Sequence, residues 1–174
     1  KHNGCHGCLP EEKGRGKDLF FYPLYRQDMR KMSVVMTGMS ASLAPRGPDA
    51  SGLYSDENAF LVHRRLIVID PDNGAQPMSA GDLTLVYNGE LYNTEELRRD
   101  LQESGVEFRG HSDTEVVLRS YEKWGEKCVE LFNGIFAFAV WDSGKKSLFL
   151  ARDRIGVKPL FYSLTPDGII FASE

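Results

Sequence analysis

Hydrophobic residues in the last third of the chain follow the two-residue period of β-strands. Between Ile135 and Trp141 both alternating sets are apolar, which predicts a strand covered on both faces. Near the start, an aromatic stretch is also strand-like, but Pro23 favours an edge position for it. We predict strands at 20–25, 51–54, 59–70, 83–87, 135–141, 147–152, 160–164 and 168–172.

Apolar residues recur at helical spacing in three other segments. The first segment is 28–44, which is followed by a proline. The second begins at a capping box with Asn93 as N-cap and is closed by Gly105. The third begins at the capping box 112–115 and ends before Gly125. Strands at both ends of the chain with helices between them predict an α+β fold of stacked sheets covered by helices, not a βαβ repeat.

Composition restricts the class of protein. A length of 174 residues with 41% apolar residues suffices for one domain with a core. The net charge of -4 comes from interspersed charges, so we expect a small molecule or a protein as partner and no nucleic acid. Apolar runs are far shorter than the roughly 20 residues that span a bilayer, so no membrane is expected. Three cysteines make no disulfide framework, which favours a cytoplasmic setting.

The stretch 87–93 reads Tyr-Asn-Gly-Glu-Leu-Tyr-Asn and follows a short apolar strand. We expect the chain to bend sharply at Asn88 and Gly89, because glycine adopts backbone angles closed to other residues and asparagine tolerates them. Such a turn would set the Asn88 amide and the Gly89 N–H side by side, as donors to a developing oxyanion. The alternative interpretation is an ordinary hairpin turn.

Seven short motifs occur in a fixed order along the chain. They are Arg46-Gly47-Pro48-Asp49, His63-Arg64-Arg65-Leu66, Gly74-Ala75-Gln76-Pro77, Tyr87-Asn88-Gly89-Glu90-Leu91-Tyr92-Asn93, Ser112-Asp113-Thr114-Glu115, Ala151-Arg152-Asp153 with Gly156-Val157-Lys158-Pro159-Leu160, and Phe171-Ala172-Ser173-Glu174. In this order they resemble the glutaminase domain of glutamine-hydrolysing asparagine synthetases. The resemblance implies a class II glutamine amidotransferase domain over 28–174, with the N-terminal-nucleophile hydrolase fold, an αββα sandwich of two antiparallel sheets between helical layers. Residues 1–27 are expected to be an atypical, disordered or non-native segment.

The resemblance also implies which residues handle the substrate, L-glutamine. Asn88 and Gly89 would form the oxyanion hole. Arg65 would bind the substrate α-carboxylate through its guanidinium fork, and Asp113 would pair with the α-ammonium. Taken alone, Arg65 reads as a surface charge and Asp113 as a helix-terminal acid. The residues expected to bind glutamine are Arg65, Val68, Asn88, Gly89, Glu90 and Asp113, and Asn88 and Gly89 are also expected to be catalytic.

The sequence departs from the family at the nucleophile. In the family the mature chain begins with Cys-Gly-Ile and a strand, and the α-amino group of that cysteine serves as base. No Cys-Gly-Ile occurs here, and Cys128 is expected to be a small buried hydrophobe in or near a helix. Three explanations of this departure stay open. Residues 1 to about 27 could be foreign or frame-shifted sequence, processing could expose Cys5 or Cys8, or the nucleophile could have been lost.

A metal site from the early histidines and cysteines is a further alternative. His2, Cys5, His6 and Cys8 would crowd a tetrahedron within seven residues, so we expect no metal.

Two hypotheses for function follow from the resemblance. The first is hydrolysis of glutamine to supply ammonia for asparagine synthesis by a synthetase domain, expected beyond Glu174. The second is a non-catalytic scaffold domain that lacks its nucleophile. We expect no cofactor in this domain, ATP and Mg for the synthetase domain, and a homodimer of the full-length protein. As written, the chain begins with Lys1 and is expected to be a fragment with little glutaminase activity.

Overall fold

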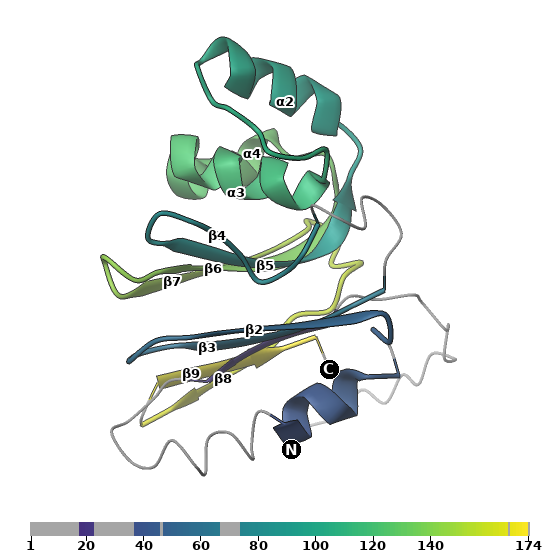
Figure 1. Cartoon of the computed structure of the whole chain (residues 1–174), viewed down its shortest axis with the longest axis vertical. Helices are drawn as coiled ribbons and strands as arrows, with labels where there is room; N and C mark the ends of the chain where they lie inside the picture. The colour runs from purple at the N-terminus through teal and green to yellow at the C-terminus, as the bar shows by residue number, and fades with distance from the viewer. Residues whose placement is uncertain (1–17, 23–36, 46, 67–73, 167, 174) are drawn as a thin grey trace, which may run out of the picture.

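The computed structural model describes residues 18–22, 37–45, 47–66, 74–166 and 168–173. Figure 1 shows a layer of helices on a first sheet, a second sheet stacked beneath it, and a helix at 37–43 against the far side of the second sheet. Each pair of neighbouring strands within the two sheets is antiparallel. The predicted α+β sandwich of stacked antiparallel sheets between helical layers is confirmed.

One sheet has five strands in the order β2-β3-β1-β9-β8. The edge position predicted for the first strand is wrong, because β1 pairs with β3 on one side and β9 on the other. The strand ends at Tyr22 and therefore contains no proline, so the edge restriction expected from Pro23 does not apply to it. The bounds are β1 Asp18–Tyr22, β2 Ala50–Ser55, β3 Phe60–Arg65, β8 Phe161–Thr165 and β9 Gly168–Ala172.

The other sheet has four strands in the order β4-β5-β6-β7. Its centre is the pairing of β5 with β6, which runs from Leu83 opposite Asp142 to Leu91 opposite Gly134. Residues 136–142 of β6 are all buried, as the two apolar sets of that strand predict. The bounds are β4 Met78–Ala80, β5 Leu83–Leu91, β6 Gly134–Asp142 and β7 Ser147–Arg152.

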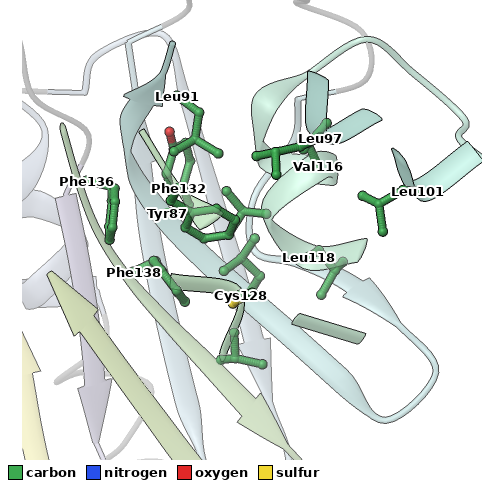
Figure 2. Close-up of a cluster of buried hydrophobic side chains, with 13 residues drawn as sticks. Tyr87, Leu91, Leu97, Leu101, Val116, Leu118, Cys128, Phe132, Phe136 and Phe138 are labelled. Carbon is green, nitrogen blue, oxygen red and sulfur yellow. The ribbon is translucent and has the colours of Figure 1, made fainter. Parts of the chain in front are cut away.

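The helices cover the outer face of this four-stranded sheet. Figure 2 shows side chains of β5 and β6, among them Tyr87 and Phe138, facing Val116 and Leu118 of the helical layer. All four of these side chains are buried. The bounds are α2 Thr94–Glu103, α3 Asp113–Trp124, the 3-10 helix Gly125–Lys127 and α4 Cys128–Leu131.

The helix ends follow the predicted signals with one exception. Ser112 caps α3, where its hydroxyl accepts the N–H of Glu115. Gly105 and Gly125 follow α2 and α3 with φ of 89° and 60°, the conformation that favours glycine at these ends. Asn93 stands at the N-cap position of α2, but its side chain makes no capping bond. Its amide group binds the Leu131 carbonyl and the Asn133 N–H instead, so the predicted N-cap position is confirmed but the side-chain bond of the predicted capping box is not formed.

A half-buried carboxylate links the two sheets. Asp56, in the turn between β2 and β3, accepts hydrogen bonds from Trp141 Nε1 at 2.6 Å and from the Tyr54 hydroxyl at 2.9 Å. Trp141 belongs to β6 of the other sheet and packs in the apolar cluster between the sheets. The polar contact therefore fixes how the two sheets are stacked at this end.

Two predicted elements fall partly outside the described residues. The helix predicted over 28–44 is present at 37–43, with Leu43 fully buried, and its earlier residues lie outside the described part. The strand predicted through 59–70 ends at Arg65, and residues 67–70 also lie outside the described part of the chain. Among the described helices, none has the length and apolarity needed to cross a membrane.

Candidate active site

The Asn88-Gly89 step lies inside β5 and makes no turn. Asn88 pairs with Ala137 and Gly89 with Phe136, in a ladder that continues to Leu91. Gly89 does not have a positive φ. The sharp bend predicted here is therefore wrong. A neighbouring strand that satisfies the backbone N–H and C=O groups outweighs the local preference of Asn-Gly for a turn.

Close approach of the two strands explains why residue 89 is glycine. A Cβ atom at Gly89 would stand 2.5 Å from the Ile135 carbonyl oxygen and 2.8 Å from Cα of Phe136. Real Cβ atoms do not come so near to backbone, so a larger residue would push β5 away from β6. The backbone around Asn88, whose side chain is only 1% exposed, is thus held tightly by packing.

Arg65 is the last residue of β3 and is 5% exposed. Its carbonyl oxygen accepts the N–H of Asp49 at 3.1 Å, and Pro48 forms an isolated bridge with it. Gly47 lets this segment pass close to β3, because a Cβ there would lie 2.5 Å from the carbonyl carbon of Arg64. The Gly-Pro-Asp part of the first motif therefore packs on the end of β3 that carries Arg65.

Asp113 is the first residue of α3, as its place in the capping box predicts. One carboxylate oxygen, Oδ2, accepts the Tyr87 hydroxyl at 3.0 Å, and the other accepts the Thr114 N–H at 2.8 Å. Among the described residues no cation is paired with Asp113. A carboxylate has about four lone-pair positions, so this one can still accept from a bound ammonium group.

Gln76 joins three elements near these residues. Its Oε1 accepts the N–H of Tyr87 at 2.6 Å, and its Nε2 donates to the Thr114 hydroxyl at 3.3 Å. Its carbonyl lies so near Gly52 of β2 that a Cβ on that glycine would overlap it. Sequence reasoning assigned no role to Gln76 or Tyr87. The only signal for them was their presence in two of the seven motifs.

A series of contacts connects Asp113 with the strand that carries Arg65. Asn88 follows Tyr87, which is bonded to Asp113. Tyr87 is in turn bonded to Gln76, whose carbonyl lies against Gly52 of the other sheet. Gly52 pairs with His63 of β3, the strand that ends at Arg65. A common pocket for Arg65 and Asp113 stays a prediction.

Glu90 and Val68 are the other two residues predicted to bind glutamine. Glu90 is exposed on β5, two residues beyond Asn88 and thus on the same face of the strand. Val68 lies outside the described residues.

Cys128 is buried in the core under the helices, as predicted for a small hydrophobe. Burial raises the pKa of its thiol to about 12, so the thiol is protonated and inert at neutral pH. Cys128 is therefore not a nucleophile. Cys5 and Cys8, and the metal site considered for them with His2 and His6, lie outside the described residues.

The two stacked antiparallel sheets between helices form the αββα sandwich of the N-terminal-nucleophile hydrolase fold. The chain belongs to the glutamine amidotransferase domain family, whose model matches residues 23–174. Membership implies glutamine as substrate.

Known proteins similar to this chain include glutamine-hydrolyzing asparagine synthetases. Asparagine synthetase (glutamine-hydrolyzing) 3 of Bacillus subtilis (strain 168) is 46% identical over 154 residues, which are 86% of this chain and 25% of that protein. Asparagine synthetase (glutamine-hydrolyzing) of Zea mays is 44% identical over 139 residues, 78% of this chain and 23% of that protein. The chain thus spans 25% or less of these relatives.

A solved structure shares the fold. Glutamine phosphoribosylpyrophosphate amidotransferase from B. subtilis, complexed with ADP and GMP, superposes with a TM-score of 0.70. The match covers 91% of this chain and 42% of that one, at 20% sequence identity.

Proposed function

We propose that this chain is a glutaminase domain that binds glutamine and, once a cysteine heads its first strand, hydrolyses the side-chain amide and supplies the ammonia for ATP-dependent asparagine synthesis by a synthetase domain. The observation that carries the proposal is the hydrogen bond from Tyr87 to Asp113. This bond holds the Asp113 carboxylate, which can accept from the substrate ammonium, next to Tyr87, the residue before Asn88 and Gly89. The names of the two similar asparagine synthetases, which join glutamine hydrolysis to asparagine synthesis, support the second half of the proposal.

Each end of glutamine has a candidate partner. The guanidinium of Arg65 suits the α-carboxylate, because its fork makes two parallel charge-assisted bonds. The Asp113 carboxylate suits the α-ammonium. The Asn88 side-chain amide and the Gly89 N–H would donate to the oxyanion that forms when the amide carbon is attacked, and donors fixed in advance stabilise that charge without reorganising. Glu90 and Val68 are proposed as further contacts.

The nucleophile that the proposed hydrolysis requires is a cysteine at the head of the first strand, as in the family, and residues 9–17, which precede β1 in this sequence, include none. β1 begins at Asp18, which pairs with Arg64. A cysteine leading into this strand would therefore lie at the end of the five-stranded sheet that also holds Arg65. Its own α-amino group, with an ordinary pKa of about 8, would take up the thiol proton.

The proposal extends to the rest of the protein. The hydrolysis needs only side-chain and backbone groups, so we propose no cofactor for this domain. ATP and Mg²⁺ are proposed for the synthetase domain, a homodimer for the full-length protein and the cytoplasm for its location. The low cysteine count supports the last of these.

The test is ammonia release and calorimetric binding with glutamine as ligand. We expect the chain as it stands to bind glutamine and to release ammonia near background. A variant with Cys-Gly-Ile placed at the head of β1 should raise the rate by orders of magnitude, because it restores both nucleophile and base. Failure of the unmodified chain to bind glutamine, together with no ammonia from the variant, would overturn the proposal.

A further inference from the structure

We infer that Gln76 and Tyr87 are positioning residues that fix the distance between the two ends of the glutamine site and so select glutamine over shorter amides. The inference rests on the proposed function. Neither residue is expected to touch the substrate. They act through Asp113 on one side and through the Asn88-Gly89 backbone on the other.

Tyr87 is suited to hold Asp113 in a single orientation. Its side chain is 0% exposed and belongs to the core cluster that includes Val116 and Phe138. Figure 2 shows it among the packed side chains of β5, β6 and the helices. A ring enclosed in this way has few rotamers open to it, so its hydroxyl is aimed by packing at Asp113 Oδ2, 3.0 Å away.

Gln76 ties the same two elements together at a second point. Its buried side-chain amide uses the oxygen for the N–H of Tyr87 and the nitrogen for the hydroxyl of Thr114. Thr114 follows Asp113, and Tyr87 precedes Asn88. β5 and the N-terminus of α3 are therefore joined twice, directly by the bond from Tyr87 to Asp113 and indirectly through Gln76, which binds both Tyr87 and Thr114. The two elements cannot slide past one another without breaking both links.

Fixed spacing has a consequence for specificity. Glutamine and asparagine carry the same groups but differ by one methylene between the α-carbon and the amide. If the ammonium acceptor and the oxyanion donors were free to shift, the site would adapt to either ligand. With their distance fixed, asparagine reaches only one of them, and a mismatch of one methylene is commonly worth about 10- to 200-fold in discrimination.

A purely structural role for these bonds makes a different prediction. A buried tyrosine hydroxyl needs a hydrogen-bond partner, and Asp113 supplies one whether or not a ligand binds. In that case Tyr87→Phe would affect all ligands alike, through stability. If Tyr87 positions Asp113 for an ammonium group, the loss is confined to ligands that carry that group.

The experiment compares glutamine with glutaramate, which is glutamine without its α-amino group, by calorimetric titration of the chain. Tyr87→Phe is expected to weaken glutamine binding by roughly tenfold, because a hydrogen bond to a charged group is lost, while glutaramate binding stays within about twofold. Tyr121→Phe is the matched control, since Tyr121 is a half-buried tyrosine of α3 that packs on Phe149. It should leave both ligands unchanged. Equal weakening of both ligands by Tyr87→Phe, or no weakening of glutamine, would overturn the inference.

A second variant covers the case in which Tyr87→Phe does not fold. Thr114→Val removes the acceptor of the Gln76 amide and leaves Asp113 bonded to Tyr87. It should lower the ratio of glutamine to asparagine affinity at least threefold, whereas an unchanged ratio would contradict the role of Gln76. If the unmodified chain binds glutamine but these ratios do not move, the proposed function stands and this inference fails. If it binds no glutamine, this inference fails, and ammonia release by the Cys-Gly-Ile variant decides whether the proposed function fails with it.

Discussion

Gly89 and Phe136 lie opposite each other on β5 and β6, so close that a Cβ atom on Gly89 would stand 2.8 Å from Cα of Phe136. This contact holds the backbone beside Asn88 at a fixed distance from the neighbouring strand. The glycine is needed for proximity and not for a turn.

Gly89→Ala is therefore expected to destabilise the fold by about 1–3 kcal/mol, the usual cost of forcing an extra carbon into a packed interior. Urea unfolding followed by tryptophan fluorescence measures the change. The matched control is Gly38→Ala in the helix at 37–43, where an added Cβ meets no atom within 4 Å. That change should be neutral or stabilise by up to about 1 kcal/mol, because alanine favours helix. Equal effects at the two glycines would contradict the close approach of β5 and β6.

The stability of the sheet stack should depend on pH through Asp56. Burial alone would raise the pKa of Asp56, but hydrogen bonds from the Asn58 N–H, Trp141, Tyr54 and the Ala59 N–H outweigh it and hold the pKa below its usual value. A carboxyl whose pKa is lower in the folded state stabilises the fold above its unfolded pKa of about 3.9. This contribution is lost as the pH falls through the folded pKa.

Asp56→Asn should accordingly lower the unfolding free energy at neutral pH, and the difference from the unmodified chain should shrink below a pH of about 4. Urea midpoints measured from pH 7 down to pH 3 give the comparison. Asp100→Asn, on the exposed face of α2, is the control and should show little difference at any pH. A difference for Asp56→Asn that stays constant over the whole range would rule out the carboxylate as its source.

Cys128 should be chemically silent in the folded protein. With a thiol pKa of about 12, roughly one molecule in ten thousand carries the thiolate at pH 8. Iodoacetamide at that pH should leave the Cys128 peptide unmodified in native protein and alkylate it in urea, as read by mass spectrometry. Cys128→Ala should keep glutamine affinity within about twofold and cost about 1–2 kcal/mol of stability through the small cavity it leaves. Labelling of Cys128 in the native state would refute this assignment.

Local patterns in the sequence predicted those parts of the fold that depend on neighbours along the chain. The two apolar sets of residues 135–141 predicted a strand buried on both faces, and the Ser112 box predicted the start of α3. The interior position of β1 was missed, because Pro23 was taken to restrict a strand that in fact ends one residue earlier.

In the candidate site, too, the local pattern failed wherever a partner far away in the sequence decides the structure. Asn88-Gly89 reads locally as a turn, and only the partner strand β6, more than forty residues later in the sequence, makes it extended. Asn93 reads locally as a cap, but its side chain is used by Leu131 and Asn133. The bonds of Gln76 to Tyr87 and Thr114 join residues far apart in the chain and leave no periodic signal. The seven motifs, not propensity, identified the residues proposed to bind glutamine.

The most direct test of the account is a crystal structure of this chain with glutamine bound. We predict that the α-ammonium nitrogen lies within about 3.2 Å of the Asp113 carboxylate, with the α-carboxylate on the Arg65 guanidinium and the side-chain amide oxygen directed at Asn88 and Gly89. Glutamine bound with its ammonium group away from Asp113, or Arg65 and Asp113 facing separate surfaces in the complex, would contradict the assignment of this site.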